Sequence, residues 1–364
     1  MELKEDQGSS WLSFLQIFSS VALKEKIVFI EDFALMLHSG IAAPRALGIL
    51  AHQTHNKKFR KILTELSAAV ESGKSLHESM AEYPAVFSNI FVSMIKVGEL
   101  SGNLDKSLEY LSIQLEREAD LKSKTKGAMI YPGVIVSAMV IIGLLMSIFV
   151  LPKLTGIFKQ FNVQLPLATR VVIAITDFMS AHSITVVVGL VAVVGLTIYA
   201  LRTPVGKRGF NWLILRMPVI NTIVKKINLA RFCRILGSMM KSGIAIVEGL
   251  QVSGEALGNV YYREVAMEAS GNVKIGKPLT EAFTHHENLF PYIVTQMLEV
   301  GEETGSIETI LEQLASHYET EVDDTMRNLS SIIEPVLLLV IGGVVGVLAL
   351  ALIGPIYSIS QSIQ

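Results

Sequence analysis

The chain has 364 residues, enough for two or three domains, of which 51% are hydrophobic and only 18% charged. Its mean hydropathy of +0.48 is too high for an ordinary soluble protein and favours a protein with membrane spans. The single cysteine, Cys233, excludes an internal disulfide and a cysteine-based metal site. We therefore expect it to be a small core residue on a helix.

The N-terminal segment, residues 1–23, has acidic residues where a secretory signal would have basic ones. We therefore expect the N-terminus to stay in the cytoplasm. Its apolar side chains crowd one side of a helical projection: Trp11, Leu12, Phe14, Leu15, Phe18 and Val21. Such a helix could lie in the membrane interface or pack on the first folded domain, and both interpretations stay open.

Most of the remaining chain is a repeat with a fixed offset of 203 residues. Residues 33–155 recur as 236–358 without a gap, and the hexapeptide from Val97 to Gly102 recurs from Val300 to Gly305. A repeat of this length indicates that one structural unit was built twice.

The two segments 24–126 and 202–330 have helical periodicity and no sustained strand-like alternation. Each is predicted to be a bundle of about five or six short helices, which makes the fold class all-α. Gly73 is suited to end a helix, and Ser75 with Glu78 has capping-box spacing for the next one. The longest helix carries an apolar stripe in both copies: Leu104, Leu108, Leu111 and Leu115, then Ile307, Leu311, Leu314 and Tyr318.

Three apolar segments are predicted to be transmembrane helices: 127–151, 183–201 and 331–357. Glu334 is the only Asp, Glu, Lys or Arg residue in them. The first contains about 20 residues between two prolines, or about 30 Å of helix, which matches one hydrocarbon core. Eleven Val, Ile, Leu and Phe residues between positions 134 and 150 favour insertion by about 5 kcal/mol.

The charge distribution predicts the orientation of these spans. Nine basic residues and no acidic one lie between Arg202 and Lys241, whereas the loop 152–182 has few charges. The positive-inside rule therefore places both bundles in the cytoplasm, and the loop and the tail 358–364 outside. The basic stretch is also suited to contact anionic lipids.

No catalytic, cofactor or metal site is expected. Gly73-Lys74-Ser75 ends like a phosphate loop, but Ala68 occupies the position of its first glycine. The pair His77-Glu78 lacks the second histidine of a zinc-protease helix. His52 and His55 share a helix face without an evident third ligand.

The repeated turn supplies one set of candidate functional residues: Gly98, Glu99 and Gly102, with Gly301, Glu302 and Gly305 in the second copy. The two carboxylates could contact a partner, or they could cap the following helix and order the turn. The structural interpretation is favoured because both copies keep the motif, whereas a docking site needs only one.

The third predicted span supplies a second set. Gly342 and Gly346 have the small-xxx-small spacing of close helix packing, either within one chain or between chains. Glu334 lies at the cytoplasmic mouth of this span, where it could pair with a basic neighbour or remain in interfacial water.

Several short motifs together resemble the type II secretion F-protein family: the paired Gly-Glu-x-Ser/Thr-Gly turns, Leu165 to Arg170, Leu215 to Pro218, and Ile333 to Pro335. The resemblance covers about residues 28–358. It implies an oligomeric platform in the inner membrane at the base of a pilus or secretion machine. It also implies bundles that meet a hexameric secretion ATPase, and a membrane region that handles pilin or pseudopilin subunits beside other inner-membrane assembly proteins.

Our hypothesis is a non-enzymatic, homo-oligomeric adaptor that converts ATPase motion into pilin movement, with no nucleic-acid partner. A small transporter or channel subunit with cytoplasmic regulatory bundles is the alternative. It would need polar pore-lining residues, and the spans offer chiefly Ser137, Ser147 and Thr197. A membrane-bound enzyme would need a nucleophile or metal set that the sequence does not present.

Overall fold

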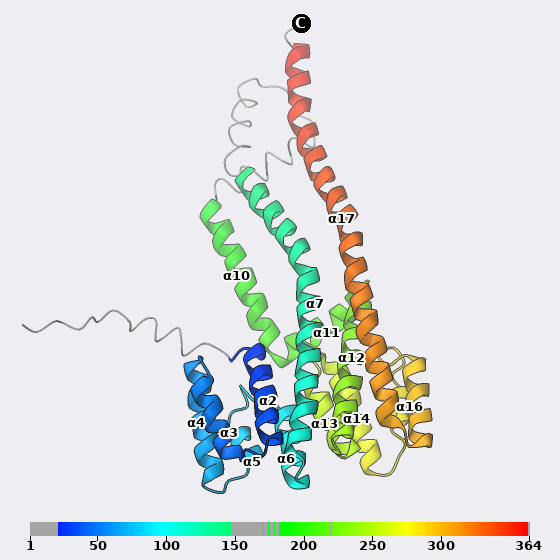
Figure 1. The fold of residues 1–364 in the computed structure, drawn as a ribbon. Coiled ribbons are helices and arrows are strands. Elements are labelled where there is room, and N and C mark those ends of the chain that lie inside the picture. The colour runs from blue at the N-terminus through cyan, green and yellow to red at the C-terminus, as the bar shows by residue number, and fades with distance from the viewer. Residues whose placement is uncertain are drawn as a thin grey trace, which may run out of the picture. The chain divides into compact units, whose positions relative to one another are not determined.

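The computed structural model describes residues 21–146, 170, 174, 178, 182–218 and 220–362, and every regular element in these ranges is a helix, as predicted (Figure 1). The chain divides into two compact units. The bundle unit comprises Met1–Lys122 and Ile214–Val322, and the apolar unit comprises Ser123–Leu213 and Asp323–Gln364. Residues 1–20, which contain most of the predicted N-terminal helix, and most of the loop 152–182 lie outside the described residues.

The first copy of the repeat, bundle 1, consists of α2 (Leu23–His38), α3 (Ala43–Gln53), α4 (Lys57–Glu71), α5 (Leu76–Ala81), α6 (Asn89–Ser101) and the first part of α7 (Leu104–Leu145). Asn56 is the N-cap residue of α4, and its side-chain oxygen accepts hydrogen bonds from the backbone amides of Lys58 and Phe59. It ends before Gly73, which has a φ of +95°, so the predicted helix-ending glycine is confirmed.

The second copy, bundle 2, consists of α12 (Ile220–Lys241), α13 (Ile246–Ala256), α14 (Val260–Lys274), α15 (Thr280–Thr284), α16 (Tyr292–Thr304) and the first part of α17 (Ile307–Ser362). It follows α10 (Ser183–Arg202) and α11 (Pro204–Arg216).

The same aromatic trio fills the core of each bundle at the 203-residue offset. In bundle 1 the ring of Phe29 lies 5.4 Å from that of Phe59 and 6.3 Å from that of Phe87. Their counterparts are Phe232, Tyr262 and Phe290, with the Phe290 ring 5.3 Å from each of the other two. The predicted apolar stripes complete the cores, with Leu108, Leu111 and Leu115 buried in α7, and Leu311, Leu314 and Tyr318 buried in α17. Cys233 is fully buried in bundle 2, as expected, and burial raises the pKa of its thiol to about 12.

The two bundles share apolar contacts within the bundle unit. Ile235, Met239, Ile244 and Val252 belong to bundle 2 by sequence, yet they pack in one cluster with the core residues of bundle 1. Bundle 1 is therefore completed by side chains encoded about 200 residues later.

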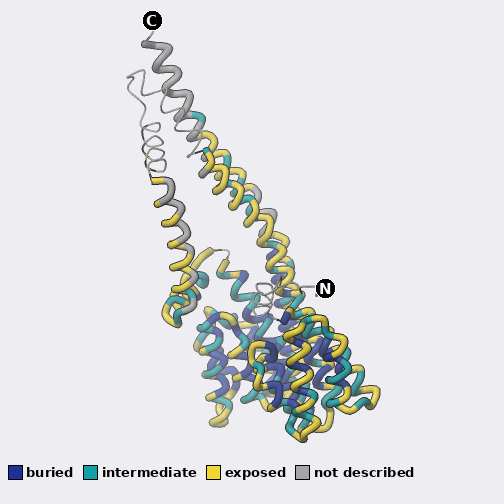
Figure 2. The backbone as a smooth tube through the Cα atoms, turned by 90° about the vertical axis from the view of Figure 1, so that its left-hand side faces the viewer, coloured by how far each residue is buried: buried dark blue, intermediate teal, exposed yellow. Residues whose placement is uncertain are grey.

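The apolar unit contains the later parts of α7 and α17 together with α10. Both long helices continue through a proline, Pro132 in α7 and Pro335 in α17, and Lys124 of α7 forms an ion pair with Asp323 of α17. Their large apolar side chains are mostly exposed, in contrast to the buried interiors of the bundles (Figure 2). Exposed apolar helices of this length need a cover other than water.

Candidate functional surfaces

The carboxylate of Glu99 links the end of α6 to the start of α5. Glu99 lies in the last turn of α6, and its carboxylate accepts hydrogen bonds from the backbone amides of Leu76, at 2.8 Å, and His77, at 3.2 Å. The Nδ1 atom of His77 lies 2.6 Å from the same carboxylate, so a protonated Nδ1 donates to it. The carboxylate thus caps the start of the preceding helix, rather than the helix that follows.

This capping pattern corrects the predicted helix start. Ser75 is the N-cap residue of α5 by position, but its Oγ atom is buried without a hydrogen-bond partner among the described residues, so the capping box with Glu78 does not form. Glu99 satisfies the orphan amides instead. The signal was present in the repeat, because Ser75 is replaced by Pro278 in the second copy while the glutamate is kept.

The environment of Glu99 favours its ionised form. Burial opposes ionisation, but the hydrogen bonds from His77 and from the amides of Leu76 and His77 outweigh it, so the pKa of Glu99 is lowered. An ionised acceptor at a helix N-terminus is also stabilised by the helix dipole.

Glu302 has the corresponding role in bundle 2. Its two carboxylate oxygens lie 2.9 and 3.1 Å from the amide nitrogen of Leu279, at the start of α15. The residue before Leu279 is Pro278, which has no N–H to offer. Glu302 therefore accepts hydrogen bonds from one backbone amide, whereas Glu99 accepts them from two.

The glycines of the turn have two separate roles. Gly102 and Gly305 end α6 and α16 with φ angles of 70° and 68°, a left-handed conformation that favours glycine. Gly98 lies inside α6 rather than in the turn, and a Cβ atom there would come within 2.6 Å of the Ser107 side chain. Its counterpart Gly301 is similarly crowded, with Ile307 Cα 3.1 Å away. These glycines let each short helix pack tightly against the start of the long one.

Helix α6 of bundle 1 also packs against α13 of bundle 2. Lys96 of α6 lies 3.5 Å from Glu248 of α13, and Asn89 donates a hydrogen bond to Glu255. Beside this contact, Gln114 of α7 accepts a hydrogen bond of 3.3 Å from Ser238 of α12. The interface between the bundles thus combines polar pairs with the shared apolar cluster.

Part of the basic stretch from Arg202 to Lys241 is neutralised within bundle 2. Arg234 forms a two-pronged ion pair with Glu319, with both N–O distances 2.8 Å. Burial opposes its charge, but Glu319 raises the pKa of Arg234 overall. Lys226 and Lys241 also form ion pairs, each through a single contact, with Glu321 at 2.6 Å and Glu312 at 3.3 Å respectively.

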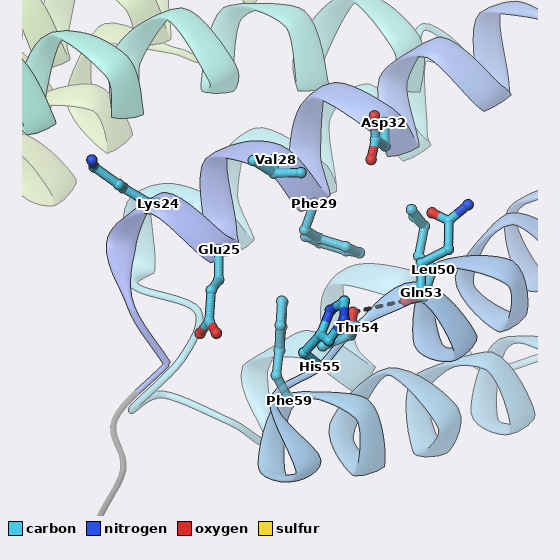
Figure 3. A pocket seen from close by; sticks show the side chains of 10 residues that line it. All are labelled: Lys24, Glu25, Val28, Phe29, Asp32, Leu50, Gln53, Thr54, His55 and Phe59. Carbon is cyan, nitrogen blue, oxygen red and sulfur yellow. Dashed lines mark hydrogen bonds between the residues drawn. The ribbon is translucent and has the colours of Figure 1, made fainter.

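A cavity of about 300 Å³ opens on bundle 1 between α2, α3 and α4 (Figure 3). Val28, Phe29 and Asp32 of α2 face Leu50 and Gln53 of α3 across it. A second cavity, of about 30 Å³, lies where α7 meets α12. Within the described part of the chain, no three His, Cys, Asp or Glu side chains are grouped as a metal site.

One described segment, Leu104–Gly143 of α7, is long and apolar enough to cross a membrane. Gly342 and Gly346 lie in α17, and a Cβ atom at either would meet nothing within 4 Å. Glu334 also lies in α17, but its side chain falls outside the described part.

Two copies of one helical bundle, each with a last helix that continues into an apolar segment, place this chain among helical proteins built from a tandem repeat. A family model described as Type II secretion system (T2SS), protein F matches residues 29–152 and again 232–355, in the register of the repeat. The chain therefore belongs to this family, which confirms the resemblance seen in its motifs.

Relatives extend the match over nearly the whole chain. It is 33% identical over 337 residues to the type IV pilus assembly protein PilC of Thermus thermophilus, a match that covers 93% of this chain and 83% of that protein. It is 30% identical over 364 residues to the type II secretion system protein F of Vibrio cholerae, covering 99% and 89%. The protein transport protein HofC homolog of Escherichia coli is 27% identical over 336 residues, covering 92% and 84%.

Proposed function

We propose that this protein is the inner-membrane platform of a type IV pilus or type II secretion machine. In that role it couples a cytoplasmic secretion ATPase to the assembly of pilin or pseudopilin subunits. The observation that carries the proposal is the duplicated family module, which this chain shares, over more than nine tenths of its length, with proteins named for pilus assembly and for type II secretion.

The platform would cross the membrane three times, through 127–151, 183–201 and 331–357, with both bundles in the cytoplasm and the C-terminus outside. Exposed apolar side chains support this topology. They include Ile141 of α7, Leu196 of α10 and Leu339 of α17, which water would solvate poorly and lipid would cover. The nine basic residues that begin at Arg202 support a cytoplasmic location for the second bundle.

The long helices give the platform a route for mechanical coupling. Each of α7 and α17 begins in the packed core of a bundle and continues without interruption into an apolar segment. A displacement of a bundle by the ATPase would pass along these helices to the membrane region, where pilin subunits enter or leave. The protein itself would be non-enzymatic, since the ATPase supplies the energy.

The transporter alternative has less support. It needs polar side chains that are free to line a pathway, but Thr197 of α10 donates its hydroxyl to the carbonyl of Val193 in its own helix, at 2.7 Å. The conspicuous carboxylates of the repeated turn bind backbone amides inside the bundles. Neither group is disposed toward a transport pathway.

The test is binding of the full-length protein, in detergent or nanodiscs, to the secretion ATPase of the same genome. Isolated segments 24–126 and 204–328 are unsuitable, because each would expose the apolar surface that the bundles share. Binding that stimulates ATP hydrolysis is expected. An ATPase that neither binds nor responds to the full-length protein would overturn the coupling proposal.

The same preparation tests whether the turn glutamates contact the partner. Glu99→Gln and Glu302→Gln keep a side-chain oxygen that can accept the backbone amides, so they would lose ATPase binding without any change in hydrogen exchange of α5 or α15 if the charged carboxylates contact the ATPase. Loss of binding together with faster exchange would identify a structural role.

Topology is tested by labelling single cysteines at Lys207 and Gln364 with an impermeant maleimide. Only the cysteine at position 364 should react from outside.

A further inference from the structure

The two bundles do not bury equivalent surfaces against each other. Ile90 of α6 is 7% exposed at the contact between the bundles, whereas its counterpart Ile293 of α16 is 55% exposed. Val97 packs against the core of bundle 1, whereas its counterpart Val300 is 49% exposed. Bundle 1 therefore uses this face to contact bundle 2, whereas the equivalent face of bundle 2 is exposed.

The opposite face shows the reverse pattern. Met239 of α12 is fully buried and the neighbouring Ser238 donates to Gln114, but the counterpart of Ser238, Leu35 of α2, is 64% exposed. Val28 of α2 is likewise exposed, although its counterpart Arg231 is half-buried. A two-fold arrangement would cover both sets equally, so the two copies pack head to tail.

We propose that a second copy of this chain covers both open faces by repeating the internal contact. The α16–α17 surface of one chain, comprising Tyr292, Ile293, Glu299, Val300 and His317, would pack on the α2–α3 surface of the next, comprising Val28, Asp32, Leu35, Arg45 and Gln53. This goes beyond the platform role and does not depend on it, because it follows from how the two repeats pack.

Charge and apolar character are complementary across the proposed contact. Lys96 and Glu248 form the ion pair of the internal contact, and their counterparts are Glu299 on α16 and Arg45 on α3. Both counterparts are exposed and again opposite in sign, with the signs exchanged. The exposed apolar side chains of α16 would meet those of α2, as α6 and α7 meet α12 and α13 inside the chain.

The cavity on bundle 1 overlaps this surface, since Val28, Asp32 and Gln53 belong to both. Their counterparts Arg231, Ile235 and Ala256 line the smaller cavity, where α7 meets α12. There α7 covers the site with Gln114, Arg117, Glu118 and Leu121, which leaves about 30 Å³ in place of about 300 Å³. Figure 3 shows the corresponding space on bundle 1 open between α2 and α3. In the proposed contact, side chains of α17 from the next chain would fill it.

Head-to-tail contacts have a defined consequence for assembly. Each chain offers one surface of each kind, so the contact either closes into a ring or continues as a filament. Because every chain contributes two bundles, a closed ring would contain an even number of them.

Cysteine cross-linking in membranes from cells lacking the ATPase tests the contact on the full-length protein. Arg45→Cys combined with Glu299→Cys should give a ladder of dimers and larger species, while each single variant stays monomeric and co-expression of the two singles gives dimers only. Lys96→Cys with Glu248→Cys is the internal control, which should close without a gain in mass. Arg45→Cys with Glu268→Cys is the matched surface control, and native Cys233 is fully buried and stays in place.

Three results would overturn the proposal. Dimers from Glu299→Cys or Arg45→Cys alone would show a two-fold contact, and no ladder from the double variant while the internal control closes would exclude a head-to-tail one. Adding Ile293→Glu should reduce the ladder at least about tenfold, since an ionised carboxylate in an apolar contact is costly. Ile275→Glu, at a 71% exposed apolar residue after α14, should leave it unchanged. Equal effects of these two substitutions would also contradict the proposal.

Discussion

Replacing Glu99 by alanine should weaken α5 more than replacing Glu302 weakens α15. Glu99 accepts two backbone amides and the His77 ring, whereas Glu302 accepts the single amide of Leu279. A lost helix cap costs about 1 kcal/mol for each amide left without a partner. We therefore expect a loss of about 2 kcal/mol at the start of α5 and about 1 kcal/mol at α15.

Hydrogen exchange of the full-length protein, measured by mass spectrometry, resolves the two helices separately. The amide of Ser79, which donates to the carbonyl of Ser75, reports on the first turn of α5. Since about 1.4 kcal/mol corresponds to a factor of ten, its protection should fall about 30-fold in Glu99→Ala. Protection of α15 should fall about fivefold in Glu302→Ala.

Glu82→Ala is the matched control for the first variant. Glu82 lies directly after α5 and pairs with Lys74, but the pair is exposed, so its loss should change protection less than about threefold. Equal losses in Glu99→Ala and Glu302→Ala, or an unchanged α5, would refute the argument that the carboxylate caps this helix.

Three further predictions follow from the same region and from the packing of the long helices. The lowered pKa of Glu99 stabilises α5 above the unfolded pKa of about 4.5, and this contribution is lost as pH falls through the folded value. Exchange protection of α5, corrected for intrinsic rates, should therefore fall below about pH 4.5 in the native chain and stay flat in Glu99→Gln; an identical pH profile in both would contradict it. Gly98→Ala should destabilise the bundle unit by about 1–3 kcal/mol in denaturant unfolding, because its Cβ would clash with Ser107, and Ser107→Gly should restore part of the loss. Gly271→Ala, where a Cβ meets nothing within 4 Å, should be neutral or stabilising, and a similar loss there would remove the packing explanation. Arg234→Met should cost about 3 kcal/mol by leaving Glu319 without its partner, and Arg234→Met with Glu319→Met should recover most of it in the same assay; no recovery would mean that the guanidinium does more than balance one carboxylate.

Local patterns predicted the local structure well. The apolar stripe of Leu108, Leu111 and Leu115, the glycine that ends α4 and the buried Cys233 all follow from helical periodicity and backbone geometry, which act over a few residues. The cap of α5 was not predicted, because the acceptor lies 23 residues from Leu76 and a nearer serine had suitable spacing.

The packing of the two copies against each other was harder to predict from the sequence. Equivalent residues such as Ile90 and Ile293 are chemically identical, so no propensity tells which of them is buried. The repeat predicted two similar bundles but not their head-to-tail contact, which depends on shape across surfaces about 200 residues apart in the chain.

The shared core also determines when the first bundle can finish folding during biosynthesis. Val252, which packs with bundle 1, is translated 155 residues after Val97, and at about 5–20 residues per second this takes roughly 8–30 s. During that interval the nascent first bundle carries an uncovered apolar face, while two apolar segments leave the ribosome. The first half of this protein therefore completes its fold only after the second half has been translated, and a stalled ribosome between the copies would release a product prone to aggregation.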